Sequence, residues 1–114
     1  MRKTKSISWI KAARKEFDAF PDGARSICLA ALTIAAEGGK SDIAKPMHGL
    51  GNGVIEIALP FRGDAFRVVY AAQIGSDIWV VHAFQKKSTQ GAKTPLREIE
   101  VIKDRIRRLK EITK

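Results

Sequence analysis

Apolar residues recur at helical spacing near both ends of the chain and at every second position in its middle. Near the N-terminus this spacing predicts helices over about residues 11–19 and 24–37, separated by Pro-Asp-Gly at 21–23. The two helices should form an antiparallel hairpin. We expect the apolar stripe of the second helix to face the protein interior. That stripe consists of Ile27, Ala30, Ala31, Ile34 and Ala35.

A period of two begins at Val54 and predicts an antiparallel meander of three strands. The strands are expected over residues 54–60, 66–72 and 78–84. Residues 5–9 also alternate polar and apolar side chains, which fits a short edge strand.

The last helix should begin at about residue 95, because Thr94 and Pro95 suit the N-cap and first-turn positions of a helix. One face of this helix is apolar. Cations crowd its other faces, and we expect them to be solvated and to strengthen a field that attracts RNA. These cations are Arg97, Lys103, Arg105, Arg107, Arg108 and Lys110. Helices on either side of a meander predict one α+β domain over residues 1–114.

The chain is strongly basic, with 21 Lys and Arg against 12 Asp and Glu and a net charge of +9. A polyanion such as RNA, DNA or an acidic protein is therefore the favoured partner, although a basic protein without such a partner remains an alternative. No apolar run reaches membrane-spanning length and no signal-peptide core is present, so we expect a cytoplasmic protein. Cys28 is the only cysteine, which suits a reducing compartment and a role as a small buried hydrophobe.

Two features of the predicted strands point to chemistry. The last strand ends at Lys86 and Lys87, so a rigid element delivers cations to one edge of the sheet. Arg67 lies in the middle of an apolar strand, where an arginine needs either a carboxylate partner or a function. Glu56 on the neighbouring strand is a candidate partner, so a structural ion pair stays open as an alternative.

A glycine-rich segment over residues 41–53 resembles a phosphate-binding loop at first sight. It lacks the required context, because no strand precedes it and the residues after it are strand-like rather than helical. We therefore expect its glycines to shape the turn into the sheet, with Lys45 and His48 left as possible anion contacts.

Four stretches of the sequence, taken in order, carry a resemblance to a known family. They are Gly-Val-Ile-Glu-Ile at 53–57, Phe-Arg-Val-Val-Tyr at 66–70, Val-His-Ala-Phe-Gln-Lys-Lys-Ser at 81–88, and Thr-Pro at 94–95 before a basic, isoleucine-rich helix. Together they resemble the phage-derived, HigB-like branch of the RelE/ParE toxin superfamily over nearly the whole chain. The resemblance implies a RelE-like α+β fold, in which an N-terminal helical hairpin and a C-terminal helix pack on a twisted antiparallel sheet.

The resemblance also implies the toxin of a type II toxin-antitoxin system, which cuts messenger RNA on the ribosome without a metal or other cofactor. An RNA 2′-hydroxyl attacks the adjacent phosphate, so the protein must align the reacting atoms and stabilise added charge. Arg67 matches the strand arginine that the family uses against the scissile phosphate, and Lys86 with Lys87 matches the basic pair of the following strand. If Arg67 and Lys87 hold the phosphate, their side chains should share one solvent-facing surface.

The remaining site residues are less constrained by the resemblance. His82 is placed with the catalytic residues as the only histidine of the strand region, and a structural core histidine is its alternative. No tyrosine follows Tyr70 and the final helix has no histidine, so the general acid and base are unassigned. Further cations are expected to bind RNA. They are Lys45, Arg62 and Lys93.

Two other functions remain open at this point. One is a ParE-like toxin that poisons DNA gyrase by binding, and the other is a non-catalytic phage-derived module that binds nucleic acid or protein. For a toxin, the resemblance implies a cognate antitoxin of the helix-turn-helix type, together with the ribosome and messenger RNA as partners.

Overall fold

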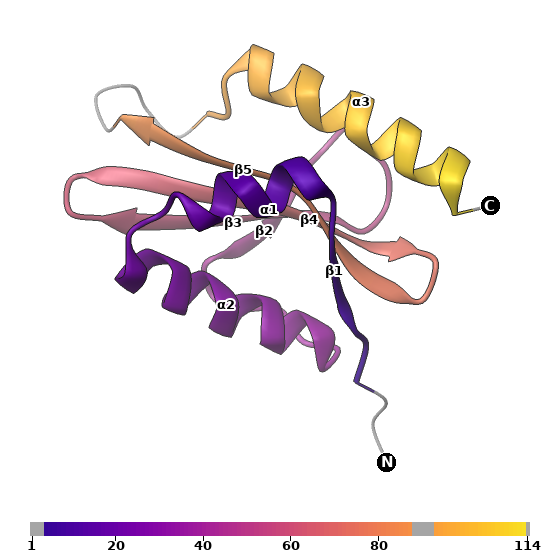
Figure 1. Cartoon of the computed structure of the whole chain (residues 1–114), viewed down its shortest axis with the longest axis horizontal. Helices are drawn as coiled ribbons and strands as arrows, with labels where there is room; N and C mark the ends of the chain where they lie inside the picture. The colour runs from indigo at the N-terminus through magenta and orange to yellow at the C-terminus, as the bar shows by residue number, and fades with distance from the viewer. Residues whose placement is uncertain (1–3, 88–92, 114) are drawn as a thin grey trace.

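A five-stranded sheet with helices on both of its faces forms the framework of the protein (Figure 1). The computed structural model describes residues 4–87 and 93–113. The strands are Ile7–Trp9 (β1), Ala44–Pro46 (β2), Val54–Phe61 (β3), Asp64–Ile74 (β4) and Asp77–Lys87 (β5). The helices are Lys11–Asp18 (α1), Asp22–Ala36 (α2) and Leu96–Ile112 (α3).

The sheet has the strand order β1-β5-β4-β3-β2 and is mixed. Strands β2 to β5 pair antiparallel, so the predicted meander is confirmed. β1 instead pairs parallel with β5, with Ile7 opposite Ile78. Strand β2 was not predicted, because three residues that include Pro46 are too short to show a period of two.

Two apolar cores lie on opposite faces of the sheet. Helices α1 and α2 pack over one face, where Leu32 and Tyr70 are among the largest fully buried side chains. Helix α3 packs over the other face, where Ile102 and Val69 belong to the same apolar cluster. Because both faces are covered, side chains of both parities along β4 are buried.

The buried face of α2 differs from the predicted stripe. Ala31 and Ala35 are buried as expected, but Ile27 and Ile34 are 43% and 40% exposed. The helix turns its small residues towards the sheet, because alanines allow a closer approach of the two backbones than isoleucines do. Cys28 is fully buried on the same face, and burial raises the pKa of its thiol to about 11.

No helix in the described part of the chain has both the length and the apolar character that crossing a bilayer requires.

Candidate functional site

The strand register gathers several of the predicted site residues on the sheet face that α3 covers. Glu56 lies opposite Val69, a residue of the α3-side core, and Lys45 lies opposite Glu56. Arg67 is two residues from Val69 on the same strand, and Lys86 lies opposite Ala65, two residues further along. Positions directly opposite or two apart share a face of a sheet. Lys45, Glu56, Arg67 and Lys86 therefore have positions on one face.

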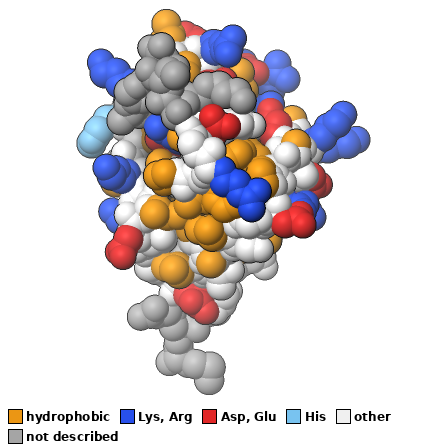
Figure 2. Space-filling model, turned by 90° about the vertical axis from the view of Figure 1, so that its left-hand side faces the viewer, with side chains coloured by type: hydrophobic (Ala, Val, Ile, Leu, Met, Phe, Trp, Pro, Cys, Tyr) orange, Lys and Arg blue, Asp and Glu red, His pale blue; other side chains and the backbone are white. Residues whose placement is uncertain are grey.

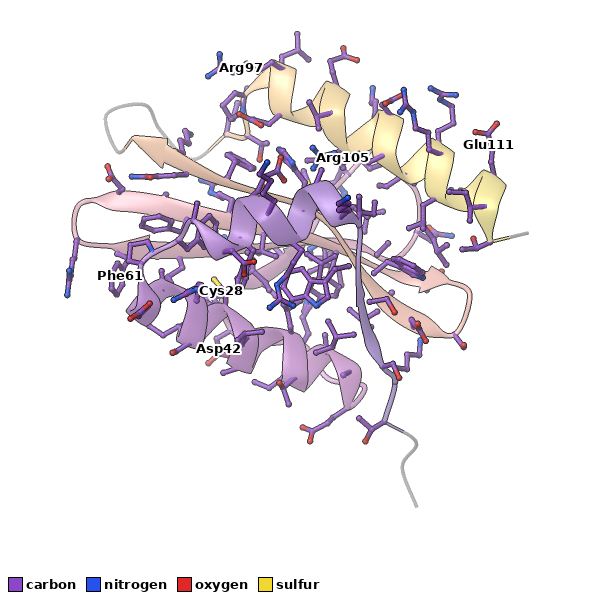
Figure 3. All side chains as sticks on the ribbon, in the orientation of Figure 1. Cys28, Asp42, Phe61, Arg97, Arg105 and Glu111 are labelled. Atoms are coloured by element: carbon purple, nitrogen blue, oxygen red, sulfur yellow. The ribbon has the colours of Figure 1, made fainter. Side chains whose placement is uncertain are left out.

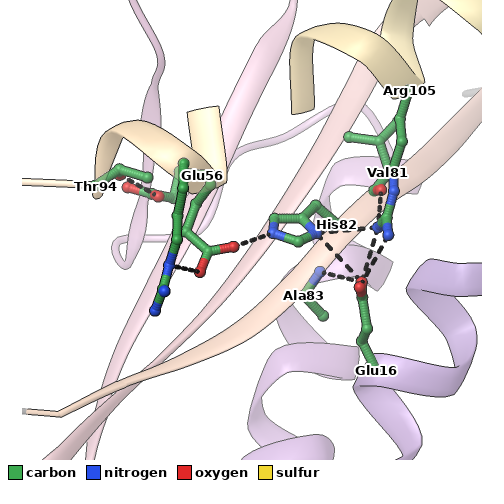
Figure 4. A network of polar contacts seen from close by, with 9 residues as sticks. Glu16, Glu56, Val81, His82, Ala83, Thr94 and Arg105 are labelled. Atoms are coloured by element: carbon green, nitrogen blue, oxygen red, sulfur yellow. Dashed lines mark hydrogen bonds and ion pairs between the residues drawn. The ribbon is translucent and has the colours of Figure 1, made fainter. Parts of the chain in front are cut away.

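Arg67 is buried in an ion pair on this face. Arg67 is only 6% exposed. Its Nη1 lies 3.1 Å from Oε1 of Glu56. The Thr94 hydroxyl donates to the other carboxylate oxygen of Glu56 at 2.7 Å, and Nη1 of Arg67 donates to Thr94 at 3.4 Å (Figure 4). Thr94 thus binds Glu56 instead of capping α3.

The expectation of a solvent-facing Arg67 is therefore wrong, and the structure shows the ion pair that was its alternative. The physical reason is the position of β4 in the centre of the sheet under α3. A guanidinium removed from water there needs a carboxylate to offset its lost hydration.

His82 is enclosed between two acidic side chains. It is 4% exposed, and its Nε2 lies 2.7 Å from Oε1 of Glu98 at the start of α3. Its Nδ1 lies 3.2 Å from Oε1 of Glu16 and 3.0 Å from Nη1 of Arg105. The ring also stacks on Phe84, with centroids 5.2 Å apart. Both ring nitrogens therefore already have protein partners.

A β-bulge at Val81 helps to direct this histidine. Val69 pairs with His82 while the next residue, Tyr70, pairs with Val80, so the register skips Val81. Bulges re-aim side chains locally. As a result both Val81 and His82 belong to the side of the sheet on which α3 lies.

Glu16 and Arg105 complete the network and were not predicted as a pair. Arg105 reaches from α3 towards α1 and binds both carboxylate oxygens of Glu16, at 2.8 and 3.0 Å (Figures 3 and 4). Its Nη1 also donates to the Val81 carbonyl at 3.1 Å, and the Ala83 amide donates to Glu16 at 3.2 Å. Arg105 was expected to be solvated, but only 19% of its side chain is exposed.

The network satisfies part of the open edge of β5. Strand β1 pairs only with residues 78–80, so the backbone groups of Val81 and Ala83 lie beyond the end of that pairing. Side chains supply the partners that a longer neighbouring strand would have given. The pair thereby fastens α1 and α3 to the same strand.

The surroundings of Glu16 favour its charged form. Burial alone would raise the pKa of this carboxyl, but hydrogen bonds from Arg105 and the Ala83 amide act in the opposite direction. The charges of His82 and Arg105 add to them, so the pKa of Glu16 is lowered from its ordinary value of 4.5.

Two lysines, Lys86 and Lys87, end β5, and the structure describes the side chain of Lys86 but not that of Lys87. The Lys86 amine donates to the Lys93 carbonyl at 2.6 Å, which joins the end of β5 to the segment before α3. Lys87 is described only in its backbone, which lies opposite Asp64. Its side chain, and with it the predicted surface shared with Arg67, lies outside the described part of the chain.

The structure separates the predicted RNA contacts. Lys45 and Lys93 are exposed on the α3 side of the molecule. Arg62 instead occupies the tip of the β3–β4 turn, with φ of 52° and its guanidinium 5.1 Å from the centroid of the Phe61 ring. Phe61 lies beside Gly23 at the start of α2, on the opposite side of the sheet (Figure 3). Viewed from the end of the β3–β4 hairpin, Lys and Arg side chains lie scattered beside an apolar area, with Asp and Glu side chains among them (Figure 2).

Among the described residues, no group of His, Cys, Asp and Glu side chains is placed to hold a metal ion.

The three helices and the five-stranded mixed sheet form a RelE-like α+β fold. The solved structure of E. coli toxin RelE, an arginine-to-alanine double mutant in the free state, matches with a TM-score of 0.59. The match covers 92% of this chain and 97% of that one at 15% sequence identity, and it confirms the predicted fold class. Residues 15–107 match the family described as phage derived protein Gp49-like (DUF891), and the chain belongs to this family. No curated protein matches the sequence.

Proposed function

We propose that this protein is the toxin of a type II toxin-antitoxin system, in the HigB-like branch of the RelE/ParE superfamily. In this proposal it is a ribosome-dependent messenger RNA endonuclease that needs no metal, with residues 1–114 as its single domain. The observation that carries the proposal is the RelE-like arrangement of nearly the whole chain. Membership of a phage-derived family supports it.

The proposed reaction is attack by an RNA 2′-hydroxyl on the adjacent phosphate. The protein's task is to align these atoms and to stabilise the charge that builds up on phosphorus-bound oxygens. An RNA phosphate would replace the Glu56 oxygen at Nη1 of Arg67, which lies 3.1 Å away. Lys86 and Lys87 would add positive charge at the end of β5. Lys45 and Lys93 would hold the flanking RNA, and Arg62 would act from the hairpin tip.

We assign His82 a positioning role within this proposal. Its two ring nitrogens contact Glu98 and Glu16, so it fastens β5 to α3 and α1. That arrangement holds Phe84, which lies opposite Arg67, in a fixed place.

A second candidate is a ParE-like toxin that poisons DNA gyrase by binding. The burial of Arg67 and His82 favours it, because both side chains already bind acidic partners. The same observation fits a non-catalytic binding module of phage origin. Neither alternative requires a phosphate to displace Glu56.

Translation in a cell-free system separates these functions. Primer extension on a reporter messenger should reveal new 5′ ends when the protein is added with ribosomes, and none with the messenger alone. A protein that leaves the messenger intact and blocks supercoiling by purified gyrase would support the ParE-like candidate. A protein with neither effect would support the binding module.

The proposed partners follow from the toxin assignment. A toxin needs a cognate antitoxin, here of the helix-turn-helix type, and acts on ribosomes and messenger RNA in the cytoplasm. A net charge of +9 would steer the protein quickly towards an acidic segment of that antitoxin. Co-expression with the product of the adjacent gene, followed by purification at low and high salt, tests this partnership.

A further inference from the structure

The glycine-rich segment and one side of α3 lie next to each other, although no sequence pattern connects them. A hollow of about 340 Å³ is lined by residues 46–49 and 51–55. A second hollow of about 290 Å³ lies between Gly49 and Leu50 of this segment and α3. Both include Gly49, so they adjoin. We call the segment over residues 47–53 the glycine loop, and the two hollows together the loop–helix groove.

The α3 wall of the groove is cationic. Lys103, Arg107 and Lys110 line it, and all three are exposed. Their spacing of three to four residues places them along one side of the helix, over a length of about 10 Å. Arg107 is bound to Asp104. Lys103 and Lys110 form no ion pair with any residue in the described ranges, so their amines remain available to an anion.

The other wall of the groove, formed by the glycine loop, includes glycines, which have no side chain. Gly49 and Gly51 have φ of 82° and 98° in the left-handed region, which favours glycine. A Cβ added at Gly49 would meet nothing within 4 Å, and one added at Gly51 would meet only Nζ of Lys110, at 3.8 Å. The Lys110 amine is therefore the group nearest to the position that a Gly51 side chain would occupy. Backbone and a free amine together form surroundings that suit a phosphate.

The groove also continues towards the proposed catalytic face. Lys45 lies on the α3 face of the sheet, and the exposed His48 lines the groove itself. Among the described residues, no Phe, Tyr or Trp side chain lines either hollow. With His48 as the single aromatic ring that its described residues supply and three cations on the helix wall, the groove offers contacts chiefly to phosphates, which carry no sequence information.

From this geometry we propose that the loop–helix groove binds the phosphate backbone of single-stranded RNA. The proposal rests on the proposed RNA-cutting function and adds a binding site outside the catalytic face. Lys103 and Lys110 each contact a phosphate, and the open backbone of the glycine loop lets the strand approach closely. RNA held here would extend past Lys45 towards Arg67.

Paired variants with equal changes of charge test the groove. Lys103→Ala with Lys110→Ala removes the two free amines. Lys11→Ala with Lys15→Ala is the matched control, because these exposed lysines lie on α1, over the other face of the sheet. Binding of a labelled 12-nucleotide RNA is measured by fluorescence anisotropy over a range of salt concentrations, without ribosomes. Thermal unfolding by circular dichroism verifies that both variants are folded.

The groove variant should make the negative slope of log K against log salt shallower by about 1.4, because each phosphate contact on a single strand contributes about −0.7. At 0.1 M salt this corresponds to binding that is roughly 25-fold weaker. The control pair should change the slope much less. Equal slopes for the two variants would overturn the proposal, because net charge alone would then explain binding.

A second arm distinguishes an RNA backbone from a free phosphate ion. Amide shifts of Gly49 and Gly51 are followed by NMR during titration with RNA and, separately, with inorganic phosphate. RNA should shift them at micromolar concentration, and phosphate should not saturate them in the millimolar range. Saturation by phosphate alone, with no effect of RNA, would overturn the proposal. An Arg67→Lys variant that binds RNA but cuts no messenger would show the groove intact while the catalytic assignment is tested separately.

Discussion

Arg105 on α3 donates two parallel hydrogen bonds to the carboxylate of Glu16 on α1, at 2.8 and 3.0 Å, across the open edge of β5. This pair connects two helices that lie over opposite faces of the sheet. Planar, two-pronged contacts of this kind are the strongest type of ion pair in proteins. We therefore expect the pair to contribute to the stability of the fold and not only to surface charge.

Replacing Arg105 by Ala should lower the free energy of unfolding by about 2 to 3 kcal/mol. This loss is smaller than the loss expected on breaking a fully buried ion pair, because the Glu16 side chain is 31% exposed and solvent screens the interaction. Urea unfolding followed by circular dichroism measures the change. Arg108→Ala is the control: its pair with Asp104 is well exposed, so its effect should stay within about 0.5 kcal/mol. Equal losses in the two variants would contradict the bridging role of Arg105.

Glu16 should make stability depend on acid pH. Its pKa in the folded protein lies below its ordinary value of 4.5, so the folded state favours the charged carboxylate. The stabilisation is present above pH 4.5 and is lost as the pH falls through the folded pKa. Unfolding measured from about pH 6 downwards should show this loss. In Glu16→Gln the dependence should be shallower, and curves that run parallel for the two proteins would refute the assignment.

The buried pair of Arg67 and Glu56 calls for a variant that removes both charges. Arg67→Ala alone would leave Glu56 buried without its cation, at a cost of about 3 kcal/mol, so lost activity could reflect lost structure. The double change Arg67→Leu with Glu56→Leu should keep stability near that of the unchanged protein. It should nevertheless lower messenger cleavage by about 100-fold or more, the usual effect of removing one charge-stabilising donor. Cleavage that survives in the folded double variant would exclude Arg67 from the reaction.

The sequence pattern predicted the long elements well, because helical spacing and runs of strand-forming residues extend over many positions. The meander was foreseen because β-branched and aromatic residues fill β3, β4 and β5, and turn residues with glycine separate them. The rotation of α2 was not, because alanine and isoleucine are equally apolar in a periodicity argument. Only packing against the sheet decides that Ala31 is buried and Ile34 exposed.

The polar network shows a different limit. Glu56 was proposed as a partner of Arg67 because neighbouring strands restrict which residues can meet. Glu16 and Arg105 are 89 residues apart, and no pattern along the chain connects them. Arg105 is one of several cations on α3. Only the packing of that helix near α1 determines that Arg105, and not another of these cations, binds Glu16.

Primer extension on a reporter messenger in a cell-free translation reaction detects the proposed cleavage itself. New 5′ ends are expected within the coding region when protein and ribosomes are both present. The same reaction with the folded Arg67→Leu and Glu56→Leu double variant should give intact messenger. An intact messenger with the unchanged protein, under conditions in which the reporter is being translated, would contradict the proposal that it is a messenger RNA endonuclease.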